Sequence, residues 1–269
     1  MNSLNGATTV SNQTAVGHLA LQSLTSGELN TAVGYIALNL NTTGSGNAAI
    51  GQNALGSNTT ADGNTGLGYS AGYGVTTGGG NTFVGASSGT GPIHATGSDN
   101  TFVGSQSGGT ATDTVNANAL GRGVKSESGY TTVGIDGSDI RAANGTATWA
   151  TVSDRRVKKD IEDSTVGLNF INDLRPRTFN YKNKGDIPEE FRGYEEGSTE
   201  SYKYSTTNHG FIAQEVKAVI DNHTDIADGF KLWDVRDTGQ QEVAEAALIP
   251  MLVKAIQELS AEVEKLKGE

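Results

Sequence analysis

The chain has 269 residues, which is long enough for two domains, and its formal net charge is -11. The acidic balance argues against nucleic-acid binding, for which a basic stripe is expected, and the absence of cysteine excludes disulfides and thiolate metal sites. There is neither an apolar run of roughly 18 residues, as a membrane span needs, nor a signal-peptide pattern at the N-terminus. We expect a soluble protein made in a cytoplasm, with no cofactor, metal, nucleic acid or membrane insertion.

The two halves of the chain differ in composition. Residues 1–150 hold 29 of the 37 glycines and only seven acidic and three basic side chains. The remaining 119 residues carry 23 acidic and 16 basic side chains. A Gly, Ser, Thr and Asn-rich segment with so little charge is either disordered or a repeat with glycine at fixed corners. The periodicity of the segment distinguishes a repeat from disorder.

A four-residue unit that ends in an aliphatic residue and glycine recurs through the first half. It reads TAVG at 14 and 31, AAIG at 48, TGLG at 65 and TFVG at 82, in steps of 17 residues. TFVG at 101, NALG at 118 and TTVG at 131 continue the series. Five copies are directly preceded by asparagine: Asn30, Asn47, Asn64, Asn81 and Asn100. Such phase-locking predicts a repeat architecture rather than disorder.

Each copy predicts one short strand, a glycine corner, a second short strand or turn, and a polar loop. The glycine allows backbone angles closed to other residues and a close approach of neighbouring coils. One coil has too few inward aliphatic residues for a core, so coils must stack or three chains must pack around an axis. We favour an all-β shaft over residues 1–135, a β-solenoid or β-roll built as a trimer, with a single-chain solenoid as the alternative. The repeats loosely resemble the head repeats of trimeric adhesins and the shaft repeats of phage tail fibres.

The second half predicts an α+β domain. Residues 168–174 indicate a short helix, residues 179–181 a strand, residues 185–208 a polar hairpin or loop, and residues 209–220 a strand that enters a helix. The chain closes on a helix with apolar residues in steps of three and four, which indicates a short coiled coil. About three heptads are too few for stability alone, so this helix needs a partner. The seam consists of Ile249, Leu252, Ile256, Leu259, Val263 and Leu266.

Four motifs in order, "SDRRVKKDI", "LRPRTFNY", "HGFIAQEV" and "LIPMLVKAIQEL", carry a more specific resemblance. Together they resemble the C-terminal intramolecular chaperone of phage tail spikes and fibres, known best from endosialidases, over residues 153–269. The resemblance implies a domain that helps three chains assemble and then cleaves itself off with a Ser-Lys dyad. It implies Ser153 as the nucleophile, Lys158 as the base and Val152–Ser153 as the scissile bond. A heptad with Ile and Leu favours two strands in isolated coils, and here we expect the assembly to overrule that preference.

The chemistry fits these residue types. A serine hydroxyl needs a neighbour that takes its proton, and a lysine does so only when it is neutral. Two residues five apart lie on different sides of a helix or strand, so Ser153 and Lys158 should meet through a turn or across chains. Asp154 is expected to orient the turn, and His209 is a candidate for assistance. The alternative is Ser153 as the N-cap of a helix with a solvated basic first turn.

The cations that could favour a neutral lysine follow the serine closely, as Arg155, Arg156 and Lys159. The dispersed carboxylates of the repeats, none of which recurs at a fixed position, argue against a glycoside hydrolase.

We therefore expect a phage tail-fibre or tail-spike fragment of the virion tail. It would comprise a repeat shaft (1–135), a neck (136–152) and a self-cleaving chaperone (153–269). The expected partners are two further copies in a homotrimer, a host-cell surface receptor such as a glycan, and other tail proteins. The alternatives are a bacterial trimeric surface adhesin, a depolymerase spike, and a fibre that keeps its chaperone as a permanent trimerisation cap.

Overall fold

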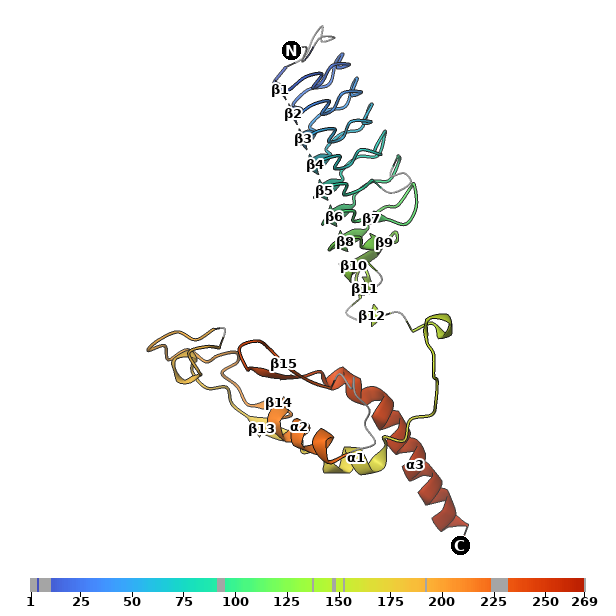
Figure 1. The fold of residues 1–269 in the computed structure, drawn as a ribbon, viewed down its shortest axis with the longest axis vertical. Helices are drawn as coiled ribbons and strands as arrows, with labels where there is room; N and C mark the ends of the chain where they lie inside the picture. The colour runs from blue at the N-terminus through green and yellow to red at the C-terminus, as the bar shows by residue number, and fades with distance from the viewer. Residues whose placement is uncertain are drawn as a thin grey trace. The chain divides into compact units, whose positions relative to one another are not determined.

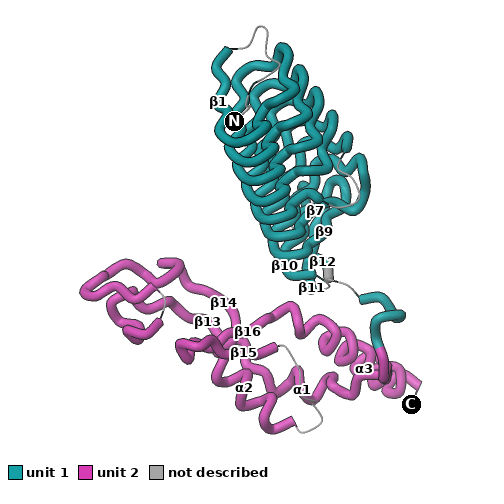
Figure 2. Tube along the Cα trace, turned by 45° about the horizontal axis from the view of Figure 1, so that its top comes forward, with its two compact units in different colours: residues 1–158 teal, residues 159–269 magenta. Residues whose placement is uncertain are grey.

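The structure is a computed structural model and describes residues 4, 11–90, 95–136, 138–146, 149–151, 153–191, 193–223 and 232–268. It divides into two compact units, residues 1–158 and residues 159–269 (Figure 2). Each unit has its own hydrophobic core.

The first unit is a β-solenoid whose coils stack in chain order (Figure 1). Each repeat contributes one three-residue strand, and successive strands pair in parallel with equivalent residues side by side, such as Ala32 with Ala49. These strands are β1 (Thr14–Val16), β2 (Thr31–Val33), β3 (Ala48–Ile50), β4 (Thr65–Leu67), β5 (Thr82–Val84), β6 (Thr101–Val103) and β8 (Asn118–Leu120). The predicted strand and glycine corner of each repeat are confirmed.

The C-terminal end of the solenoid changes from parallel to antiparallel pairing. Strand β10 (Tyr130–Ile135) pairs in parallel with β8 and then in antiparallel with β11 (Ser138–Ala143), which pairs with β12 (Ala150–Thr151). A small second sheet joins β7 (Gly108–Gly109) to β9 (Lys125–Ser126). The main sheet thus continues past residue 135, into the segment expected as a neck.

The core of the solenoid lies within one chain. The middle residue of a strand points inward, and Ala32, Ala49, Phe83 and Phe102 are fully buried there. Leu21, Leu38 and Leu55 fill the core from the turns that follow. Stacked coils therefore supply the burial that one repeat lacks. A second chain is not needed for it.

The recurring asparagines form a buried ladder inside the solenoid. Asn64 Oδ1 accepts hydrogen bonds from the backbone N–H and from Nδ2 of Asn81 in the next coil, at 2.9 and 3.0 Å. Asn64 Nδ2 donates to the carbonyl oxygen of Gly78 at 2.9 Å. Buried polar groups need such partners, so the asparagine before each of the strands β2 to β6 is explained by its link to the next coil.

The glycine after each strand is explained by a close approach between coils. Gly68 has a φ of +133°, and a Cβ added there would lie 2.8 Å from the backbone carbonyl carbon and oxygen of Gly85. The equivalent Gly34, Gly51 and Gly104 face the next coil in the same way. Both predicted reasons for glycine, unusual backbone angles and close approach, are confirmed at this corner.

The second unit consists of short helices, one long helix and two small two-stranded sheets (Figure 1). β13 pairs with β14 and β15 with β16, both antiparallel, and α1 packs against the long helix α3. Phe170, Leu174, Val216, Leu232 and Leu248 form its core. In chain order the elements are α1 (Leu168–Asp173), β13 (Arg177–Phe179), η2 (Lys184–Asp186), β14 (Asn208–Gly210), α2 (Ala213–Asn222), β15 (Trp233–Val235), β16 (Gln241–Val243), η3 (Glu245–Leu248) and α3 (Ile249–Lys267).

The predicted elements of this unit are present with small shifts. The helix expected at 168–174 ends at Asp173, and the strand expected at 179–181 lies two residues earlier, at Arg177–Phe179. The segment 209–220 forms the end of β14 and most of α2, as predicted. The β15–β16 hairpin was not predicted.

Candidate active site

Ser153 and Lys158 flank a single 3-10 turn, η1 (Arg155–Val157), near the end of the first unit. Asp154 is the N-cap of this turn, because its Oδ1 accepts a hydrogen bond from the backbone N–H of Arg156 at 2.8 Å. Ser153 precedes the cap, so the alternative of Ser153 as the N-cap is wrong. The Ser153 hydroxyl does not cap the turn, so it can bind another side chain.

That partner is Lys158. Its Nζ donates a hydrogen bond to Ser153 Oγ at a distance of 2.7 Å. The backbone is extended at Lys158 (φ -114°, ψ 147°), so the chain leaves the turn there and the lysine side chain reaches back to the serine. Of the two routes that the spacing left open, the structure brings these residues together through a turn within one chain. A serine hydroxyl within hydrogen-bond reach of a basic group is the geometry that an activated nucleophile needs.

The cations next to Ser153 differ in whether an acidic side chain compensates their charge. The Arg156 guanidinium binds both carboxylate oxygens of Asp154, with Nε 3.0 Å from Oδ1. These hydrogen bonds hold the pKa of the Asp154 carboxyl below its ordinary value. Lys159 Nζ lies 3.9 Å from the Asp160 carboxylate. Within the described residues Arg155 has no ion pair, so its charge is the least compensated of the cations expected to favour a neutral lysine.

Both members of the pair are exposed to solvent. A lysine acts as a base only in its neutral form, which burial or nearby positive charge favours. In one chain the hydrogen bond between Lys158 and Ser153 is formed while the Lys158 amine is exposed.

Two other residues, Val152 and His209, were predicted as part of the cleavage site. Val152, on the other side of the expected scissile bond, lies outside the described residues. His209 belongs to the second unit, where it is exposed on β14 opposite Thr178. Its role in assisting Ser153 stays a prediction.

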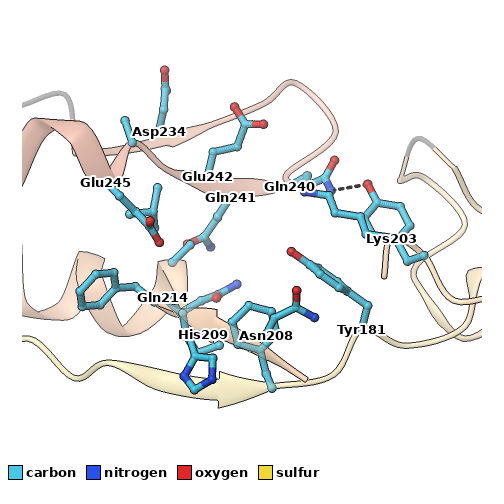
Figure 3. A pocket seen from close by; sticks show the side chains of 18 of the residues that line it. Tyr181, Lys203, Asn208, His209, Gln214, Asp234, Gln240, Gln241, Glu242 and Glu245 are labelled. Carbon is cyan, nitrogen blue, oxygen red and sulfur yellow. Dashed lines mark hydrogen bonds between the residues drawn. The ribbon is translucent and has the colours of Figure 1, made fainter. Parts of the chain in front are cut away.

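His209 lines a cleft of about 940 Å³ that sequence reasoning missed (Figure 3). Tyr181 contributes an aromatic wall with Tyr202, their ring centres 6.1 Å apart, and Gln240 Nε2 donates to the Tyr202 hydroxyl at 3.0 Å. The cleft is built from three separate segments of the sequence, so no local motif predicts it. The cluster of tyrosines in the polar insertion is the one signal that could have pointed to it.

The six residues predicted as an oligomerisation seam all lie on α3 and are all exposed, from 40% for Val263 to 73% for Leu266. The helix contacts its own unit through another face: Ala255 is buried, and Glu258 Oε2 accepts from the backbone N–H of Leu168 at 2.8 Å. The seam is thus an apolar strip that its own unit leaves uncovered.

Comparison with protein families supports the assignment of this region. Residues 153–225 match the family model described as chaperone of endosialidase, a peptidase family. Residues 153–225 thus carry the chaperone domain of this family. The match begins at Ser153, the first residue of the candidate pair. No curated protein and no solved structure shows significant similarity to the chain.

Two kinds of feature are absent from the part of the chain that the structure describes. None of its helices combines the length and the apolar character needed to cross a bilayer. No group of three or more histidines and acidic residues there could hold a metal ion.

Proposed function

We propose that the chain is part of a phage tail fibre or tail spike whose C-terminal domain is a trimerisation chaperone that releases itself by cleavage at Val152–Ser153. The observation that carries this proposal is the 2.7 Å contact between Lys158 Nζ and Ser153 Oγ at the first residue of the chaperone-family match. The solenoid would be the product that remains on the virion and contacts a host-cell surface receptor, such as a glycan, and other tail proteins.

The cleavage is a serine acyl transfer followed by hydrolysis. Neutral Lys158 takes the proton of the Ser153 hydroxyl, and Oγ attacks the carbonyl carbon of Val152. The C–N bond breaks, the proton passes to the leaving amino group of Ser153, and an ester joins Val152 to Oγ. Water then hydrolyses this ester and leaves a carboxylate on Val152 and a free amino group on Ser153. The reaction occurs once per chain and turns over no other substrate.

The repetitive sequence of the solenoid is the reason why a trimerisation chaperone would be needed. Its coils are nearly alike, so three shafts could associate one coil out of step at little energetic cost. A chaperone that joins the three C-termini raises the local concentration of the shafts and fixes their register. The exposed seam of α3, from Ile249 to Leu266, is the surface expected to join the chaperones. Cleavage then removes the clamp and makes assembly kinetically irreversible.

Two measurements on the purified full chain test the proposal. Sedimentation should give the mass of three chains before cleavage, and N-terminal sequencing of the smaller product after cleavage should read Ser-Asp-Arg-Arg, beginning at Ser153. A cut at another bond would contradict the assignment of Ser153. Trimers without a cut would favour the alternative of a permanent trimerisation cap.

A further inference from the structure

A row of aliphatic side chains runs along the outside of the solenoid. The third residue of each short strand is aliphatic, and its side chain points away from the core, opposite to the buried middle residue. Five of these residues are exposed by 37–57% even though they are large and apolar. The complete row is Val16, Val33, Ile50, Leu67, Val84, Val103 and Leu120.

The row is continuous because the strands pair in register. Val16 lies beside Val33, Val33 beside Ile50, and Ile50 beside Leu67. Neighbouring strands are about 4.8 Å apart, so seven coils give an apolar row about 29 Å long. A soluble monomer rarely leaves so long an apolar surface open, and such surfaces mark contacts with other molecules.

The core does not account for this row. Residues such as Leu38, Leu55 and Phe83 are fully buried and form one core cluster inside the solenoid of a single chain. An aliphatic residue at the third position of every strand is therefore not needed for the folding of the single chain. Threonine would suit an exposed strand position equally well.

The strand residues that flank the row on the outer face carry no charge. The first residue of each strand points to the same outer face as the third, and these residues are threonine, alanine or asparagine. Like charges facing each other across an interface cost several kcal/mol, and the strand residues of this face bring no such charges together when they meet a copy of themselves.

We propose that this face packs against the same face of two further copies of the chain, with the three aliphatic rows converging on the trimer axis. An identical copy has an apolar row of the same length and the same spacing, so each residue meets its counterpart when the chains are parallel and in register. The inference rests on the proposed trimer, in which the α3 seams hold the copies parallel. It adds the surface through which the shafts touch.

The row also explains why a register device is needed. Its members are only valine, isoleucine and leucine, so a shift by one coil replaces one aliphatic contact by another. The shaft faces therefore stabilise association without defining its register, and the chaperone supplies what they lack.

Cysteine cross-linking tests the assignment directly, because the chain has no cysteine of its own. We would make Leu67→Cys on the row and, as the matched control, Thr60→Cys, an exposed residue on the polar loop of the neighbouring coil. Each full-length variant is treated with a short bismaleimide, and its oligomeric state is measured by sedimentation. Ile50→Cys, in the coil before Leu67, repeats the test at a second position of the row.

The expected result is a trimer in every variant, with cross-linked pairs forming about tenfold faster at Leu67→Cys and Ile50→Cys than at Thr60→Cys because the row holds the thiols together. A trimer that cross-links equally slowly at all three positions, or fastest at Thr60→Cys, would overturn the assignment of this face and leave the proposed chaperone function intact. A monomer would contradict the trimer itself, and with it both proposals.

Discussion

Lys158 Nζ lies 2.7 Å from Ser153 Oγ, although five residues separate them in the chain. The contact depends on η1 and on the Asp154 side chain that caps it, since an extended segment or a longer helix would point the two side chains apart. The pair is therefore preformed by local structure within one chain. What the single chain does not supply is burial of the amine, so we expect cleavage to follow assembly rather than precede it.

Replacement of the lysine separates its charge from its basicity. In Lys158→Arg the cation remains, but a guanidinium cannot give up a proton at neutral pH. We expect cleavage to slow by about 10²–10⁴-fold, the usual range for loss of a general base, while sedimentation still shows trimers. The matched control is Lys159→Arg, because Lys159 is the neighbouring exposed lysine and does not contact Ser153 among the described residues. Equal cleavage in both variants would exclude Lys158 as the base.

The buried asparagine ladder predicts a large loss of stability on truncation. In Asn64→Ala, the backbone N–H of Asn81 and the carbonyl oxygen of Gly78 each lose a side-chain partner inside the solenoid, and Asn81 Nδ2 keeps only Gly97 of its two acceptors. We expect the free energy of unfolding to fall by about 2–4 kcal/mol, measured by chemical denaturation followed by circular dichroism. Thr60→Ala, on the exposed loop, should change it by less than about 0.5 kcal/mol. Equal losses would mean that the ladder is not a structural link between coils.

The second unit should lose stability in acid. Arg177 Nε and Nη2 donate to the Glu215 carboxylate at 2.8 and 2.6 Å and join β13 to α2. These hydrogen bonds lower the pKa of Glu215, so the pair stabilises the folded state above the unfolded-state pKa of about 4.3. That contribution is lost as the pH falls through the lower pKa of the folded state. The pair is about one-third exposed, which keeps the effect modest.

The test compares thermal unfolding of wild type and Glu215→Gln from pH 7 to pH 3. The variant should unfold at a lower temperature at pH 7, and the difference should shrink as the pH approaches 3. Glu196→Gln is the control, because Glu196 is exposed and makes no ion pair in the described part of the chain. A difference that stays constant over the whole range would exclude the ion pair as its cause.

The solenoid could be predicted because its signals repeat. A strand of three residues is too short to recognise once, but TAVG, AAIG and TFVG at a fixed step expose the strand and the glycine corner together. What the pattern could not show was that one chain completes the core. Leu21, Leu38 and Leu55 complete the core from positive-φ positions in the turns. The alternation of inward and outward residues along a strand does not predict core residues at such positions.

The second unit was predictable only in part. The helices α1, α2 and α3 have apolar spacing that can be read directly, whereas β15 and β16 are three residues each and pair through a turn without repetition. The spacing of Ser153 and Lys158 left a turn and a contact between chains equally open, because the deciding feature is the cap that Asp154 provides. The cleft beside His209 depends on tertiary contacts alone.

The most direct test of the central claim is the intact mass of the freshly purified full-length protein, measured beside a Ser153→Ala variant. We predict two fragments that break between Val152 and Ser153 in the wild type, and one uncut chain of 269 residues in the variant. A single uncut chain in both would contradict self-cleavage, and fragments that persist in the variant would contradict Ser153 as the nucleophile.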